Sequence, residues 1–117
     1  MLYQVGTQKE ILSLQSKLPE CIIQELLPYT IDLDVEYGID RDYLESGGYA
    51  LIAENIEDML SIQKIIDYTI HPCEWVDYID EDRQYLVALY MMNNDFSIAV
   101  VMPTAIAPEA ILNELED

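Results

Sequence analysis

Basic residues are scarce in this sequence of 117 residues, in which five Lys and Arg stand against 23 Asp and Glu, for a formal net charge of −18. Every charged side chain after Arg83 is acidic. Direct binding to a nucleic acid or to an anionic membrane needs clustered Lys and Arg, which neutralise the phosphate groups. The sequence therefore excludes nucleic acid and anionic membrane as direct ligands.

Cysteine and histidine are also scarce, since the chain contains only Cys21, Cys73 and His71. Two cysteines cannot form a disulfide framework, and with one histidine they cannot supply four nitrogen and sulfur ligands to a structural zinc ion. We therefore expect a reducing compartment, no bound metal and no cofactor.

Targeting and membrane-spanning patterns are missing as well. Residues 1–10, MLYQVGTQKE, lack the basic stretch followed by an apolar stretch that marks a secretory signal. No apolar run approaches the roughly 18 residues that a membrane-spanning helix needs. We expect a cytoplasmic protein.

Apolar residues, in contrast, are abundant, because hydrophobic residues make up 51% of the composition. This content separates the chain from disordered sequences, which combine high charge with low hydrophobicity. A chain of this length buries roughly 65% of the surface that its unfolded form exposes. No repeat, low-complexity tract or long linker divides it, so we expect a single domain over residues 1–117.

The first half of the chain predicts helices and strands in turn. Thr7 and Glu10 have the spacing of a capping box, and the apolar residues that follow recur at helical spacing, which predicts a helix over 8–18. Residues 19–27, PECIIQELL, suit either a second short helix or a buried strand. The alternation of apolar and polar residues over 29–37 predicts a strand with one buried and one solvated face, and 49–54 predicts another strand.

The second half opens on a predicted helix that Asn55 caps, with Glu57 and Asp58 in its first turn. Its predicted inner stripe consists of Ile56, Met59, Leu60, Gln63 and Ile66.

Three strands and a last helix follow. Residues 73–79 read as a strand with Cys73, Trp75, Asp77 and Ile79 on one side. The runs YLVALYMM and FSIAVVM, joined by an Asn/Asp turn, predict a hairpin at the centre of the sheet, because both are nearly apolar on both faces. A helix over 108–116 should end the chain. The pattern predicts an α+β fold with a mainly antiparallel sheet of about five strands and three or four helices packed on it.

The predicted strand over 29–37 carries an acidic row of Asp32, Asp34 and Glu36. An EF-hand loop that began at Asp32 would need glycine at its sixth position and glutamate at its twelfth, where this chain has Tyr37 and Tyr43. In a strand the three carboxylates lie about 7 Å apart, too far to share one ion. One interpretation of the row is an ordinary solvated face. Like charges along a strand are nevertheless unfavourable unless something compensates them.

A docking surface for a basic protein is the other interpretation of these acids. Tyrosine rings supply buried area at an interface and carboxylates bind Arg and Lys. A second acidic run occupies the turn before the hairpin, where an ordinary solvated turn is the alternative. The candidate partner-binding residues are Asp32, Asp34, Glu36, Tyr37, Asp40, Asp42 and Tyr43, with Asp80, Glu81 and Asp82 in the second run.

Enzyme chemistry has little support in the sequence. His71 and Cys73 have the residue types of a nucleophile and its base, but no oxyanion loop or third orienting residue accompanies them, and packing is the default role of a cysteine. No glycine-rich phosphate loop is present. We assign no catalytic residue and do not expect an enzyme.

These observations favour an acidic binding module that docks on a basic surface of a partner macromolecule, with carboxylates placed where phosphates would lie. Inhibitors of nucleases, of restriction enzymes or of CRISPR enzymes, and immunity proteins against toxins, are analogous in charge. One alternative is a structural protein without catalytic activity, in which the hairpin over 85–102 helps to form a homodimer. A second alternative is a small enzyme that uses the acidic cluster with a divalent cation.

Overall fold

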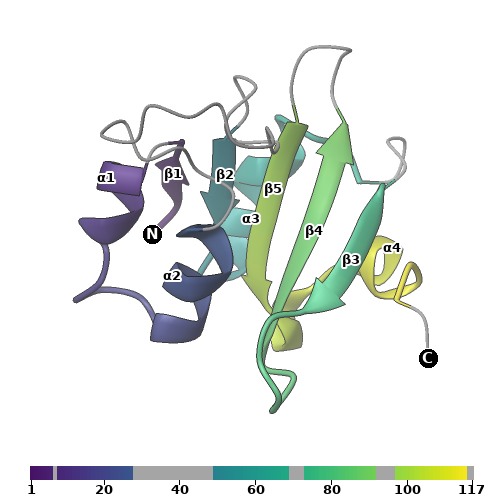
Figure 1. Ribbon diagram of the computed structural model, residues 1–117. Helices are drawn as coiled ribbons and strands as arrows, with labels where there is room; N and C mark the ends of the chain where they lie inside the picture. The colour runs from purple at the N-terminus through teal and green to yellow at the C-terminus, as the bar shows by residue number, and fades with distance from the viewer. Residues whose placement is uncertain (7, 28–48, 69–72, 92–96, 116–117) are drawn as a thin grey trace.

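The computed structural model describes residues 1–6, 8–27, 49–68, 73–91 and 97–115 (Figure 1). The predicted strand over 29–37 lies outside these ranges. Within them, no helix is long and apolar enough to cross a membrane. The elements are, in chain order, β1 (Tyr3–Val5), α1 (Gln8–Leu12), α2 (Glu20–Leu26), β2 (Tyr49–Ile52), α3 (Ile56–Gln63), β3 (Trp75–Tyr78), β4 (Tyr85–Met91), β5 (Ser97–Pro103), the 3-10 helix η2 (Thr104–Ile106) and α4 (Glu109–Leu112).

The strands form one mixed sheet in the order β1-β2-β5-β4-β3. Neighbouring strands are antiparallel except for β2 and β5, which are parallel. The predicted hairpin is confirmed as β4 and β5, and each of its strands has a neighbour on both sides. The predicted α+β fold, with five mainly antiparallel strands and four helices in the described part, is also confirmed.

The hairpin is buried on both faces, as its apolar composition predicts. Val87, Ala99 and Val101 lie in a core cluster with residues of α1 and α2. Leu86 and Val100 alternate with them and lie in a second cluster with residues of α3 and α4. The sheet is therefore the middle layer between two pairs of helices, which Figure 1 shows on opposite sides of it.

The first helix is shorter than predicted, because α1 ends at Leu12 instead of continuing to residue 18. The Ser13 hydroxyl donates to the Glu10 carbonyl over 2.6 Å, and side chains that bond to the backbone in this way compete with helix propagation. Turns follow in which the N–H of Leu14 bonds to the Ile11 carbonyl, three residues back. The Glu10 carboxylate accepts from the Gly6 N–H over 3.0 Å, which secures the start of the helix.

Residues 19–27, whose sequence suits either a helix or a buried strand, contain the helix α2, which buries Ile22, Ile23 and Leu26. This spacing places the three side chains on one face against the sheet, whereas a strand would have separated the adjacent Ile22 and Ile23.

The capped helix α3 is confirmed, but the predicted inner stripe is partly wrong. Met59, Ile62 and Ile66 are buried, as is Asp58. Two predicted members, Ile56 and Leu60, are exposed by 62% and 57%, and Gln63 is half-buried. The helix carries two apolar stripes, and the sheet covers only the one that contains Ile62.

The start of α3 is held by two hydrogen bonds to the side chains of Asn55 and Asp58. The Asn55 side chain accepts from the Asp58 N–H over 2.9 Å, and the Asp58 carboxylate accepts from the Glu54 N–H over 2.8 Å. The amino group of Met1 lies 3.1 Å from the same carboxylate. Burial alone would raise the pKa of Asp58, but these donors outweigh it and the pKa is lowered.

Strand β3 is shorter than predicted, and Cys73 and Trp75 lie on opposite sides of the sheet and not on the same side. Cys73 precedes the strand and packs with Val76 and Tyr78 against the cluster under α3 and α4. Trp75 pairs with Leu89, which packs on the opposite face. The strict alternation from Cys73 to Trp75 fails because the strand begins only at Trp75.

We predict that Asn55→Ala lowers the free energy of unfolding by about 1 kcal/mol, because it removes the side-chain acceptor at the start of α3. Urea unfolding measures the change. Ser61→Ala is the matched control, since its exposed hydroxyl donates within the same helix to the Glu57 carbonyl and alanine favours helices. Equal stability of Asn55→Ala and the unmodified protein would contradict the assigned cap.

Candidate functional site

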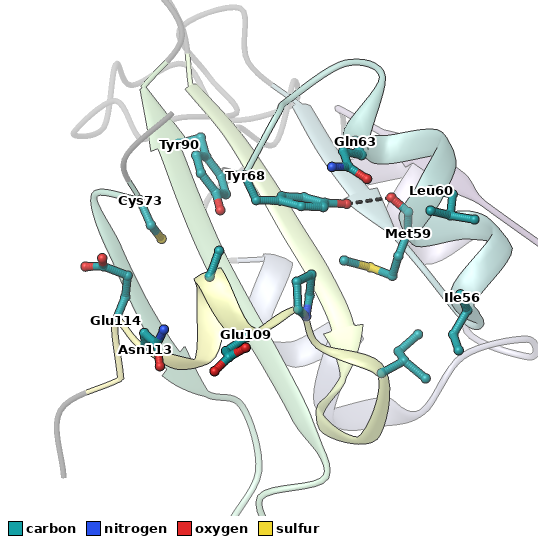
Figure 2. Close-up of a pocket in the computed structure, with 13 residues that line it drawn as sticks. Ile56, Met59, Leu60, Gln63, Tyr68, Cys73, Tyr90, Glu109, Asn113 and Glu114 are labelled. Carbon is teal, nitrogen blue, oxygen red and sulfur yellow. Dashed lines mark hydrogen bonds between the residues drawn. The ribbon is translucent and has the colours of Figure 1, made fainter. Parts of the chain in front are cut away.

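A cavity of about 880 Å³ lies between α3 and α4 on one face of the sheet (Figure 2). We call it the apolar cleft. Its volume falls in the range of ligand and anchor-residue pockets, roughly 300–1,000 Å³. It is lined by Ile56, Met59, Leu60, Gln63, Tyr68, Cys73, Tyr90, Ile106, Pro108, Glu109, Ala110, Asn113 and Glu114.

Two buried tyrosines lie deep in the apolar cleft. The Tyr68 hydroxyl donates to the Met59 carbonyl over 2.6 Å, drawn as a dashed line in Figure 2. Burial raises the pKa of Tyr68 to about 12, so the hydroxyl keeps its proton at neutral pH. Burial, and then the neighbouring Cys73, raise the pKa of Tyr90 as well. The cleft therefore offers neutral aromatic surface.

The two walls of the apolar cleft differ in chemistry. On the α3 side, Ile56 and Leu60 stand four residues apart and remain largely exposed. Large aliphatic side chains that flank a cavity in this way are typical of binding surfaces. On the α4 side, the exposed Glu109 and Glu114 place carboxylates at the rim. A ligand that suits both walls combines an apolar part with a positive charge.

Cys73 is a packed cysteine and not an activated one. Its thiol donates to the Trp75 carbonyl over 3.1 Å and contacts the Leu89 carbonyl at 3.6 Å. Burial raises the pKa of the thiol above the ordinary value, although the backbone hydrogen bonds oppose this shift. A nucleophilic cysteine needs the opposite shift. The proposed partner of Cys73 in such a pair, His71, lies outside the described residues.

Among the described residues, no group of three or more His, Cys, Asp or Glu side chains is arranged to hold a metal ion. The cation-dependent alternative relies on the acidic row of Asp32, Asp34 and Glu36, which lies outside the described residues. Tyr37, Asp40, Asp42 and Tyr43 also lie outside them and likewise keep the status of predictions.

The second acidic run lies in the connection between β3 and β4, as predicted. Asp80 has a structural role there, because its carboxylate accepts from the N–H groups of Gln84 and Tyr85 over 2.9 and 3.0 Å. Glu81 and Asp82 are exposed and make no ion pair with the described residues. Two of the three predicted carboxylates are thus available to a partner.

Arg83 shapes the same turn. Its φ of 58° lies in the left-handed region, and its N–H donates to the Asp80 carbonyl over 3.1 Å. The guanidinium lies 5.2 Å from the centre of the Tyr78 ring, a cation–π distance. One of the few basic side chains is therefore placed on an aromatic ring.

Comparison of the chain with protein-family models, with curated proteins and with solved structures finds no match.

Sequence reasoning missed the apolar cleft because it assigned Ile56 and Leu60 to the inner stripe of α3. A usable signal was present. The apolar residues of this helix fall into two stripes, and a helix that packs on one side needs only one of them.

We predict that Cys73 resists alkylation. In a Cys21→Ser variant, the pH at which the rate of reaction with iodoacetamide is half-maximal should lie above 9.0, the ordinary pKa of the thiol, because burial disfavours the thiolate. Mass spectrometry of the labelled protein measures the rate. A midpoint below 9.0 would contradict the packing role and restore the nucleophile interpretation.

Proposed function

We propose that this protein is an acidic binding module that docks on a basic surface of a partner protein. The observation that carries the proposal is an apolar cleft, with Ile56 and Leu60 exposed beside it, in a chain with a net charge of −18. Apolar anchors give an interface its affinity, whereas charge gives it rate and selectivity.

In the proposed mechanism the negative charge attracts the partner over a long range, so association is fast and sensitive to salt. An apolar side chain of the partner then enters the apolar cleft, and Lys or Arg beside it binds Glu109 or Glu114. Burial of Ile56 and Leu60 contributes to the affinity, at about 25 cal/mol per Å² of apolar surface removed from water.

The partner that fits this chemistry best is a protein with a basic nucleic-acid site. Carboxylates that occupy such a site exclude the phosphates of its substrate, so the module acts as an inhibitor by mimicry. In this proposal the acidic row over 32–36 and the exposed Glu81 and Asp82 provide further carboxylates that bind the basic site of the partner.

A homodimer is the rival use of an exposed apolar surface. The described residues of the 85–102 hairpin offer no such surface, because Leu86 to Ala88 and Ile98 to Met102 are buried. A dimer through the apolar cleft would bring two chains of charge −18 together, which their mutual repulsion opposes.

The test is capture from a lysate of the native host at about 50 mM and about 500 mM NaCl, with the retained proteins quantified by mass spectrometry. We expect a basic nucleic-acid-binding protein at low salt that high salt releases. A bait with Ile56→Ser and Leu60→Ser should lose it. The matched control is Leu12→Ser, which removes an aliphatic side chain that is 39% exposed on the opposite side of the sheet.

A bait with Asp32→Lys, Asp34→Lys and Glu36→Lys tests the acidic row separately and should also lose the partner. If the unmodified protein and all the variants retain the same proteins, neither the apolar cleft nor the acidic row is the binding surface. If sedimentation shows a stable dimer at both salts and no basic protein is retained, the homodimer replaces the proposal.

A further inference from the structure

We infer that the outer edge of β3 is a second site on this protein, which accepts an extended peptide strand that carries Lys or Arg. The inference rests on the proposed function and names how one class of basic partner would bind.

Strand β3 has an unpaired edge within the described part of the chain, because it pairs only with β4. The Ile79 N–H donates to the Tyr85 carbonyl over 2.9 Å, and Asp77 pairs with Val87 in the same register. Hydrogen-bonding direction alternates along an antiparallel strand. The backbone groups of Asp77 therefore point toward β4, and those of its neighbours in β3, Val76 and Tyr78, point outward.

A groove of about 520 Å³ follows this edge. It is lined by all four residues of β3, by Glu74, and by Glu114 and Leu115 after α4. A groove that runs along a strand and exposes its free backbone groups is the geometry in which peptides add to a sheet. Glu114 also lines the apolar cleft, so the two sites are adjacent.

Trp75 is the aromatic platform of this groove and the only tryptophan of the chain. Its side chain is 37% exposed, although it belongs to a strand of the sheet. An edge that needs protection only from aggregation carries charges and not a large apolar ring. Tryptophan is the best cation–π acceptor among the side chains, and Arg or Lys is its natural ligand.

The charges of the groove select a basic occupant. Among the described residues that line it, the ionisable side chains other than Tyr78 are the carboxylates of Glu74, Asp77 and Glu114, and none is Lys or Arg. The guanidinium of Arg83 lies 5.2 Å from the centre of the Tyr78 ring, so one aromatic ring that lines the groove already contacts a cation of the chain itself. A second copy of β3 would set these carboxylates against their equivalents, which disfavours a dimer through this edge.

Asp77 protects the edge in the free protein. Its carboxylate accepts from the Tyr78 N–H over 2.8 Å and so covers one of the outward donors. A carbonyl of the incoming strand takes over that donor, and the released carboxylate binds a Lys or Arg of the same strand. Docking therefore exchanges one internal hydrogen bond for a backbone hydrogen bond and an ion pair.

The two sides of β3 define the pattern of the occupant. Trp75 and Asp77 point to one face of the sheet and favour basic side chains there. Val76 and Tyr78 point to the other face, where Leu115 lies beside them, and favour aliphatic side chains. The strand that fits alternates basic and β-branched residues.

The test titrates the unmodified protein with a peptide of three Arg-Val repeats, acetylated and amidated at its ends, at about 20 mM NaCl. Trp75 fluorescence reports on the groove directly. We expect a saturable change. The same peptide with every backbone nitrogen methylated keeps the side chains and the charge but cannot donate backbone hydrogen bonds, so it should bind at least about tenfold more weakly.

Asp77→Lys should also weaken binding at least about tenfold, since it replaces an attractive charge in the groove by a repulsive one. Glu20→Lys is the matched control, because it makes the same change of charge at an exposed residue of α2 that does not line the groove, and it should alter affinity by less than about threefold.

The outcomes separate this inference from the proposed function. If the methylated peptide binds as tightly as the unmethylated one, strand addition is wrong, whereas the proposed binding of a basic partner still stands. No fluorescence change with either peptide overturns the groove as a site, while the capture experiment still tests the apolar cleft on its own.

Discussion

Burial of the β4–β5 hairpin on both of its faces is the constraint on which the rest of the structure depends. The chain carries a net charge of −18, and self-repulsion of that size opposes any compact state. Five consecutive residues of β5, Ile98 to Met102, are each no more than 1% exposed, and they alternate between two core clusters. Burial on two faces requires helices on both sides, so α1 and α2 cover one face while α3 and α4 cover the other. The hydrophobic gain of this central layer offsets the repulsion, which leaves the surface free to be acidic.

The helices α3 and α4 cover their face of the sheet incompletely, and the candidate site lies in the gap that they leave. The helix α4 spans only four residues, and η2 before it only three, so an apolar cleft remains between them and α3. Tyr68 and Tyr90 fill its depth with neutral aromatic surface, and the Tyr68 hydroxyl is satisfied by the Met59 carbonyl. The rim then combines exposed Ile56 and Leu60 with carboxylates of the α4 side. Where the cover of this sheet is thin, the protein therefore presents an apolar and acidic surface next to the edge of β3 that pairs with no strand among the described residues.

The sequence predicted the elements whose signals are local and strong, and it failed where packing decided the outcome. The N-cap Asn55 and the apolar runs of β4 and β5 were sufficient to place α3 and the central hairpin. The end of α1 at Leu12 could not be foreseen from spacing, because Ile11, Leu14 and Leu18 are all buried whether they lie in one helix or in successive turns. The parallel pairing of β2 with β5 joins segments distant in sequence and has no local signature. Of the predicted site residues, Glu81 and Asp82 are exposed as expected, whereas Asp80 holds the turn. The apolar cleft depends on how α3 is rotated against the sheet, which apolar spacing alone does not define.

The proposal of a basic partner requires that cations of the chain itself do not balance most of its acidic surface. The most direct measurement is the free energy of unfolding by urea, an uncharged denaturant, at about 10 mM and about 300 mM NaCl. Screening weakens repulsion between exposed carboxylates, so the account predicts that stability rises with salt. A free energy of unfolding that stays constant or falls between the two salt concentrations would contradict it, because the carboxylates would then already be balanced by cations of the chain itself.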